Sequence, residues 1–269
     1  MTKQKATQPK DSDGQPPDLR ARMSVGARIL HKWSGHRLLQ IPATSGDRYC
    51  VVQLDDYAAL PRRRFPWHPP VKLQLRARVS APDLPGTWGF GWWNDPFSTQ
   101  LGLGGAARRL PAMPNATWFF HASPPNHLAL CDDHPVRGFL AATFAAPRVP
   151  WPLLALGMPA LPLLAWPLTA RVLRRAARLF VREDARTLDV DAVEWHDYEL
   201  AWHPKQVRFS VDGEVRFATP VVPNSPLGLV IWIDNQFMAF PPDGRLRFGH
   251  LANPEAQLEV DQISLLETK

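Results

Sequence analysis

The stretch that decides the fold runs from Trp195 to Thr219 and reads WHDYELAWHPKQVRFSVDGEVRFAT. Apolar residues occupy alternate positions on both sides of a turn-forming His-Pro-Lys-Gln segment, which is the period of half-buried β-strands. The dipeptide Asp212-Gly213 then predicts a tight hairpin, because a type I′ turn needs positive φ at both central residues. This one stretch therefore predicts three antiparallel strands and an all-β meander.

Composition agrees with a large β-domain. The chain has 269 residues, enough to bury a substantial core, and its 29 prolines and 16 glycines are a loop-rich inventory. Eleven tryptophans are many for a chain of this length, and not all of them need lie in the core. The two cysteines, Cys50 and Cys131, are too few for a disulfide framework, so they leave the redox compartment open.

The net charge of +6 comes mainly from one short segment. That segment holds Arg171, Arg174, Arg175, Arg178 and Arg182, and without it the chain is close to neutral. A distributed basic footprint is therefore missing, which argues against nucleic acid as a partner.

The N-terminal residues 1–22 are polar and rich in Lys, Gln, Asp and Pro. They contain no apolar run, so the sequence predicts a disordered tail and no secretory signal, and hence a cytoplasmic protein. Residues 23–269 are expected to form a single β-sandwich domain.

Alternating or aromatic runs predict further strands. They cover Leu38–Ile41, Tyr49–Leu54, Val71–Val79, Thr87–Trp93, Thr117–His121 and Gly138–Phe144. In Thr87–Trp93, one face carries Trp88, Phe90 and Trp92, and the other carries Gly89, Gly91 and Trp93. Glycine inside a strand often marks the close approach of another backbone or a ligand.

Residues 147–186 interrupt the β pattern. Val149 to Ala170 has no charged residue but five prolines, which argue against one continuous transmembrane helix. Apolar residues then recur at helical spacing through residues 172–180, and the five arginines are expected on the opposite face. The segment is expected to be an apolar, proline-broken arm followed by a basic amphipathic helix.

Two interpretations of this insertion remain open. In one, residues 149–182 contact a membrane surface or a lipid-like partner, and the arginines meet phosphate headgroups. In the other, the insertion packs on the sandwich as a lid and turns its arginines to water. The residues expected to make the membrane or partner contact are Trp151, Leu154, Trp166, Arg171, Arg174, Arg175 and Arg178.

Several of these motifs resemble one family. Phe65-Pro66-Trp67, Leu75–Val79, Leu84–Trp88, Trp195–Trp202, Val207–Gly213 and Pro226–Asn235 follow the order and spacing of laminarinase-type glycoside hydrolases of family 16. The chain thus resembles the concanavalin A-like lectin/glucanase superfamily. The resemblance implies a jelly roll, a sandwich of two antiparallel sheets with a concave sugar-binding face, interrupted here by the apolar and helical insertion.

The catalytic signature of that family is missing. Its members carry Glu-x-Asp-x-(x)-Glu on one strand, which supplies the nucleophile and the acid/base of a retaining mechanism. The matching stretch here, Asn115–Ser123, contains no carboxylate. The family's ordinary mechanism is therefore not expected.

Asp95 and Asp234 are the candidates for relocated catalytic carboxylates. Each follows an aromatic strand, and the two strand ends would meet if the strands were neighbours in one sheet. Together with Asn94 and Asn235 these residues could instead bind a structural calcium through oxygen ligands. The alternative is that all four are turn residues that satisfy local backbone groups.

The remaining candidates form a ligand-binding set. These residues are Trp92, Trp93, Asn94, Asp95, Trp118, His121, Trp232, Asp234 and Asn235, the indoles for stacking on sugar rings and the polar groups for hydroxyls. Each tryptophan could instead belong to the core.

The first hypothesis is a non-catalytic or atypical protein that binds a carbohydrate or glycolipid-like amphiphile, without cofactor or catalytic metal. The alternatives are a hydrolase or lyase using Asp95 and Asp234, and a structural or membrane-peripheral module.

Overall fold

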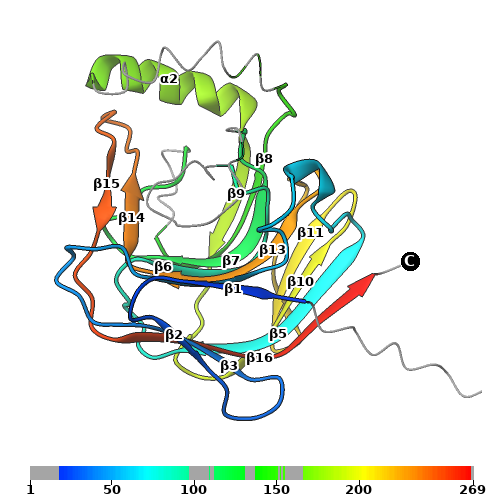
Figure 1. The fold of residues 1–269 in the computed structure, drawn as a ribbon. Coiled ribbons are helices and arrows are strands. Elements are labelled where there is room, and N and C mark those ends of the chain that lie inside the picture. The colour runs from blue at the N-terminus through cyan, green and yellow to red at the C-terminus, as the bar shows by residue number, and fades with distance from the viewer. Residues whose placement is uncertain are drawn as a thin grey trace, which may run out of the picture.

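The structure is a computed structural model and describes residues 18–96, 109, 112–130, 137–150, 152, 154 and 166–267. Within these residues the strands form two seven-stranded sheets and one separate hairpin (Figure 1). Every pair of neighbouring strands in them is antiparallel. The protein is therefore an all-β sandwich of the jelly-roll kind, as predicted.

The first sheet, called sheet I, consists in spatial order of β1 (Arg20–Met23), β4 (Val51–Asp55), β13 (Gly228–Asp234), β6 (Thr87–Trp93), β7 (Ala116–Ala122), β8 (Gly138–Ala145) and β9 (Arg182–Thr187). Sheet II consists of β12 (Glu214–Thr219), β11 (Val207–Val211), β10 (His196–Trp202), β5 (Val71–Val79), β16 (Ala256–Glu267), β3 (Arg37–Ile41) and β2 (Arg28–Leu30). The separate hairpin is β14 (Gln236–Ala239) with β15 (Arg247–His250). The helical elements are the 3-10 turn η1 (Arg62–Arg64) and α2 (Pro167–Phe180).

The deciding stretch folds as its pattern predicts. Strands β10, β11 and β12 form the meander, and β10 also pairs with β5. Asp212 and Gly213 have φ of 53° and 80°, the positive values that a type I′ hairpin turn requires. Local turn chemistry and alternation are therefore enough to fix this part of sheet II.

The core lies between the two sheets. On β5 every odd-numbered residue from Val71 to Val79 is buried, while the even-numbered positions stay partly exposed. From sheet I the core receives Trp88, Phe90 and Trp92, which are at most 2% exposed. Trp92 meets Trp202 of β10, with the ring centroids 5.8 Å apart. Large rings in this layer supply much of the apolar area that holds the sheets together.

Two predicted boundaries are wrong by a few residues. Arg20–Met23 forms strand β1 and pairs with β4, so the last residues assigned to a disordered tail belong to sheet I. Arg182–Thr187 forms β9 and pairs with β8, so the end of the predicted insertion also belongs to that sheet. Both are outermost strands, which carry little apolar signal because one edge and one face are open.

The predicted helix of the insertion is α2. Pro167 occupies its first turn, where the missing N–H costs nothing. Figure 1 shows α2 above the side of sheet I that faces away from sheet II, with the β14–β15 hairpin beneath one of its ends. At that end the Arg171 Nε donates to the carbonyl of Asp243 over 2.9 Å. Among the described residues no helix has the length and apolar character needed to cross a bilayer.

Candidate ligand-binding face

The outer face of sheet I, the face turned away from sheet II, holds the candidate site. Strand alternation sends every second side chain there, and the ladders arrange these positions in rows across the strands. From β4 to β8 one row is Gln53, Trp232, Gly89, Phe120 and Leu140, and the next is Asp55, Val230, Gly91, Trp118 and Ala142. A third row, from β13 to β8, is Gly228, Trp93, Ala116 and Phe144.

Five rings on these rows form one continuous surface, which we call the aromatic face: Trp93, Trp118, Phe120, Phe144 and Trp232. Trp118 lies at its centre, with ring centroids 5.8 Å from Trp93, 5.5 Å from Phe120 and 5.4 Å from Trp232. The Phe144 ring, on β8, has its centroid 6.3 Å from that of Trp118. Trp93 and Trp118 are partly exposed, whereas Phe120 and Trp232 are nearly covered.

Gly89 and Gly91 make room for this face. A Cβ on Gly89 would lie 2.4 Å from the Phe119 carbonyl oxygen and 2.9 Å from the Trp232 ring. A Cβ on Gly91 would lie 2.6 Å from the Cα of Trp118. The close approach that the sequence predicts at these glycines is therefore made by strand β7 and by the indole of Trp232.

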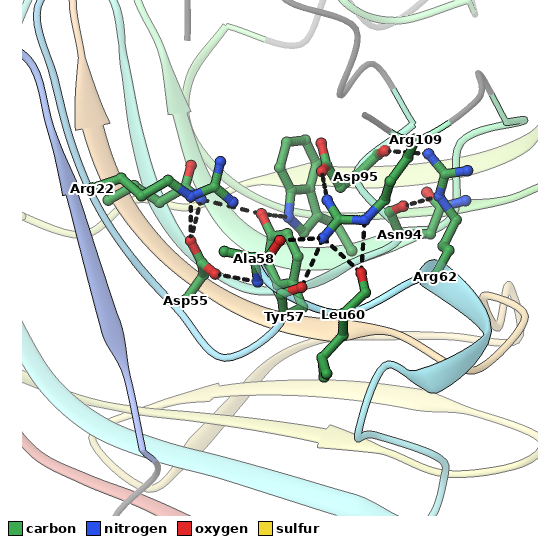
Figure 2. A network of polar contacts seen from close by, with 11 residues as sticks. Arg22, Asp55, Tyr57, Ala58, Leu60, Arg62, Asn94, Asp95 and Arg109 are labelled. Atoms are coloured by element: carbon green, nitrogen blue, oxygen red, sulfur yellow. Dashed lines mark hydrogen bonds and ion pairs between the residues drawn. The ribbon is translucent and has the colours of Figure 1, made fainter. Parts of the chain in front are cut away.

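A polar cluster borders the aromatic face on the β1–β4 side (Figure 2). The Asp55 carboxylate, which is fully buried, accepts hydrogen bonds from Arg22 Nε at 2.9 Å and Gln53 Nε2 at 2.8 Å. The Tyr57 hydroxyl accepts from Gln53 Nε2 at 3.2 Å and from Trp93 Nε1 at 2.6 Å. Burial raises the pKa of Tyr57, so this hydroxyl keeps its proton. Trp93 thereby joins the aromatic face to the polar cluster.

Arg109 extends the cluster toward Asp95, as Figure 2 shows. Its guanidinium pairs with the Asp95 carboxylate and also donates to the carbonyls of Tyr57, Ala58 and Leu60. Arg62 donates to the Asp95 carbonyl at 2.7 Å from the other side. Burial raises the pKa of Asp95, while the charge of Arg109 opposes that rise. Asp95 is thus a structural partner of two arginines, in a backbone conformation with φ of 47°.

Trp92 and His121 lie on the wrong side of sheet I for the role predicted for them. Trp92 is fully buried in the core. The His121 ring stacks on Trp88, with centroids 5.5 Å apart, and its Nε2 pairs with the Leu84 carbonyl. Burial lowers the pKa of His121, which favours a neutral imidazole. Neither side chain reaches the aromatic face, because alternation turns both toward sheet II.

The side chains of Asp234 and Asn235 form hydrogen bonds that hold the end of β13 to neighbouring segments. Asp234 Oδ1 accepts from the hydroxyl and the backbone N–H of Thr87, and Oδ2 accepts from the Tyr49 hydroxyl at 3.1 Å. Burial raises the pKa of Asp234 to about 6, although these hydrogen bonds act to lower it. Asn235 accepts from the Cys50 N–H and donates to the carbonyls of Arg48 and Leu251.

The expectation that Asp95 and Asp234 lie close together is wrong. Strands β6 and β13 are antiparallel neighbours, so Asp234 pairs with Thr87 at one end of β6, while Asp95 follows Trp93 at the other. Six residues of strand separate the two ends, about 20 Å at 3.3 Å per residue. Glycosidase carboxylate pairs stand about 5–9.5 Å apart. The two residues therefore cannot act as one catalytic pair.

The oxygens suggested for a structural calcium already accept hydrogen bonds, and the calcium stays a prediction. The side-chain oxygens of Asn94 and Asn235 accept backbone N–H groups of Asn115 and Cys50. In the described part of the chain no three His, Cys, Asp or Glu side chains are grouped closely enough to hold a metal ion. Of the four residues only Asp234 accepts a nearby backbone N–H, that of Gln236. Asn94, Asp95 and Asn235 bind groups from distant segments of the chain, so the turn interpretation fits only in part.

Strand β7 presents only apolar side chains to the outer face. They are Ala116, Trp118, Phe120 and Ala122. A ring and a methyl group can neither attack an anomeric carbon nor protonate a leaving oxygen. The strand is thus built for contact with an apolar surface.

The residues predicted for membrane or partner contact differ in their exposure. Trp151 lies outside the described residues, and Leu154 is partly buried. Trp166 is 60% exposed, and Arg171, Arg175 and Arg178 are exposed on α2. Arg174 is buried, with Nη1 donating to the Ala129 carbonyl at 2.8 Å.

Sequence reasoning missed the polar cluster. Gln53 and Asp55 are polar residues at alternate positions of a strand otherwise made of apolar residues, and this was the available signal. Arg22 and Arg109 reach the cluster from distant parts of the chain, so no local sequence pattern predicts their contacts.

No protein-family model matches the sequence, and no curated protein matches it either. Among solved structures the chain is similar to an endo-β-1,4-glucuronan lyase from Trichoderma reesei, with 13% identity, 93% of this chain and 88% of that chain covered, and a TM-score of 0.47. It is also similar to a β-glucanase from Bacillus licheniformis, with 10% identity, coverage of 89% and 82%, and a TM-score of 0.45. A β-1,3-glucanase from Mycobacterium marinum gives 12% identity, coverage of 96% and 92%, and a TM-score of 0.45. Likeness of this degree provides no residue-level correspondence, so the sandwich fold of this protein rests on its own strand pairing.

Proposed function

We propose that this protein binds a carbohydrate chain along the aromatic face of sheet I and does not cleave it. The observation that carries the proposal is the continuous surface around Trp118, with three other rings within 6 Å of it. Sugar rings present apolar C–H faces that stack on indole. Trp93, Trp118 and Phe144, on three adjacent strands, keep part of their surface exposed and can offer stacking positions.

The polar cluster supplies the directional contacts of this proposal. Binding sites for small molecules are mostly apolar, with a few polar groups that fix orientation. Arg22 Nη2 is buried and has no hydrogen-bond partner among the described residues. A sugar hydroxyl or a sugar carboxylate is the kind of acceptor that would satisfy it. The cluster therefore favours a ligand with oxygens near the Trp93 edge.

A hydrolase or lyase built on Asp95 and Asp234 is not favoured. The two carboxylates stand at opposite ends of the β6–β13 ladder, and each is held by partners of its own. Neither is free to change its hydrogen bonds during a proton transfer. Binding without cleavage is the function that this geometry supports.

The test is a glycan-array screen of the full chain, followed by titration of soluble polysaccharide hits into wild type and variants. Trp118→Ala is expected to weaken binding about tenfold, which corresponds to about 1.4 kcal/mol. Trp33→Ala is the matched control, because Trp33 is 50% exposed but lies outside sheet I, next to the end of β2. Thermal melting of both variants separates loss of binding from loss of fold.

Equal affinity of Trp118→Ala and wild type for every hit would exclude the aromatic face as the site. Including gangliosides and other glycolipids beside the free glycans tests the amphiphile alternative. A protein that binds only the lipid-linked forms would shift the proposal to a glycolipid-like ligand. Cleavage of any hit, detected as new reducing or unsaturated ends, would overturn the non-catalytic part.

A further inference from the structure

Helix α2 turns its apolar stripe outward. Leu168, Val172 and Leu179 are 73%, 63% and 82% exposed. Positions four and seven residues apart fall on one side of an α-helix, so these three side chains form a single stripe. An amphipathic helix on a globular domain ordinarily buries such a stripe. Here the stripe is exposed.

The opposite side of α2 is small and polar, and it is this side that packs. Ala170 is fully buried, and the buried Arg174 lies over the Phe240 ring at 5.8 Å while it donates to the Ala129 carbonyl. Gly244 lets the first turn approach closely, since a Cβ there would lie 2.3 Å from the Pro167 carbonyl oxygen. These contacts fix which side of α2 faces water. The helix packs on the domain through its small and polar side, so it is not a lid that packs through its apolar face.

Arginines follow the exposed stripe along one flank. Arg175, Arg171 and Arg178 are all exposed, and at 100° per residue they lie about 40°, 80° and 100° from the centre of the stripe, all on the same flank. Arg175 is the nearest of them to the stripe, and along the helix axis it lies between Val172 and Leu179. Trp166 and Phe180, 60% and 55% exposed, stand at the two ends of the helix. Apolar side chains, flanking cations and terminal aromatics are the composition of a helix that lies in a membrane interface.

We propose that α2 docks this protein on the surface of a bilayer that contains anionic lipids, with the helix axis in the membrane plane. The stripe from Leu168 to Leu179 is about 17 Å long at 1.5 Å per residue, suited to lying on the surface rather than crossing it. The arginines supply charge complementarity to phosphate headgroups. A nucleic acid would use the arginines but leave the leucines and valine without a partner.

The inference is independent of carbohydrate binding, since α2 shares no residue with the aromatic face. Figure 1 nevertheless places α2 on the same side of the sandwich as that face. A docked protein would therefore hold its ligand-binding sheet toward the membrane surface.

The experiment is co-sedimentation of the full chain with phosphatidylcholine vesicles, with and without about one third phosphatidylglycerol. Wild type is expected to sediment with the anionic vesicles and to be released by salt. The double variant Leu168→Gln/Leu179→Gln is expected to bind at least tenfold more weakly. Arg175→Gln is expected to bind about fivefold more weakly, because one basic residue near such a surface contributes about that factor.

Val215→Gln is the matched control, an equally polar change at an apolar residue that is 55% exposed on β12 of sheet II. It should bind like wild type, and circular dichroism should show all variants folded. Failure of wild type to bind either vesicle overturns the proposal, as does binding that the Leu168→Gln/Leu179→Gln change leaves intact. Light scattering gives the remaining outcome: a dimer that this change dissociates, without vesicle binding, would show that a second copy covers the stripe.

Discussion

Arg22 on β1 and Asp55 on β4 form an ion pair across the edge of sheet I, with 2.9 Å between Nε and the carboxylate oxygen. The Asp55 side chain is fully buried, while that of Arg22 keeps 19% of its surface exposed. β1 pairs with no strand other than β4 in the described sheet, so this contact secures a short edge strand as well as the polar cluster. Taking a carboxylate out of water is costly unless a cation and hydrogen-bond donors compensate.

Arg22→Ala is therefore expected to lower the free energy of unfolding by about 3 kcal/mol, because it leaves the buried Asp55 charge without its cation. Arg20→Ala is the control: Arg20 belongs to the same strand but is exposed, and its loss should change stability by less than about 0.5 kcal/mol. Urea unfolding of the two variants and wild type measures both values. Similar losses in both variants would mean that the pair adds nothing beyond the strand itself.

Gly89→Ala tests the close packing behind the aromatic face. Gly89 does not have the positive φ that penalises a side chain, so any cost must come from the collision of the new Cβ with the Phe119 carbonyl and the Trp232 ring. We expect a loss of about 3 kcal/mol or more, at the upper end for overpacked cores. Gly138→Ala is the converse control, since Gly138 has φ of 79° but no atom within 4 Å of a new Cβ.

For Gly138→Ala the backbone alone should cost about 1 to 2 kcal/mol. Thermal or urea unfolding under the same conditions compares the two variants. A smaller loss for Gly89→Ala than for Gly138→Ala would show that strand β7 and Trp232 can move aside, and that the aromatic face is less firmly built than its contacts indicate.

Alternation and turn chemistry predicted most strands of the sandwich because these signals are local. The meander from His196 to Thr219 and the two faces of β5 are examples. The same signal shows that Trp92 and Trp93 point in opposite directions, but not which of them faces the second sheet. That choice depends on which strands of sheet II lie opposite, where Trp202 receives Trp92.

Strand order and direction could not be predicted, and the error over Asp95 and Asp234 follows from this. Two acidic residues that each end a strand lie together if the strands are parallel and far apart if they are antiparallel neighbours. The polar cluster depends on order as well, since Gln53 meets the aromatic face only because β4 pairs with β13. The orientation of α2 was beyond local signals too, because the burial of Arg174 beside Ala170 is a product of tertiary contacts.

Arg174→Met tests how α2 is seated. Methionine keeps the length of the side chain but loses the hydrogen bond to the Ala129 carbonyl and the cation over Phe240. We expect α2 to detach more readily, with a loss of about 2 kcal/mol and faster proteolytic cleavage at the helix. Arg175→Met, at the exposed neighbouring position, should leave both measurements unchanged. Equal protease sensitivity of the two variants would contradict the seating role of Arg174.

Asp234→Asn separates the burial of a charge from the hydrogen bonds that surround it. Oδ1 accepts from Thr87 Oγ1 and from the N–H groups of Thr87 and Gln236, whereas Oδ2 accepts from the Tyr49 hydroxyl. An asparagine can keep its oxygen at the first position and donate its amide to Tyr49, whose hydroxyl can rotate to accept. The substitution therefore removes the charge and preserves the network.

The pH dependence of this variant has a definite sign. Burial raises the pKa of Asp234 from 3.8 to about 6, so between these values the folded protein holds a proton that the unfolded chain has released. The stability contributed by this group is therefore greatest at low pH and falls as the pH rises through that window. Above pH 6 the ionised, buried carboxylate lowers the free energy of unfolding by about 2 to 3 kcal/mol.

The Asn variant should match wild type near pH 4 and be the more stable of the two, by that amount, at pH 7. Asp56, whose pKa is also raised by burial to about 6, is present in both proteins, so its effect cancels in the difference. Urea unfolding at pH 4, 5, 6 and 7 measures that difference directly. A difference that stays constant across the series would show that Asp234 does not titrate in this window, and that its four donors hold its pKa near the ordinary value.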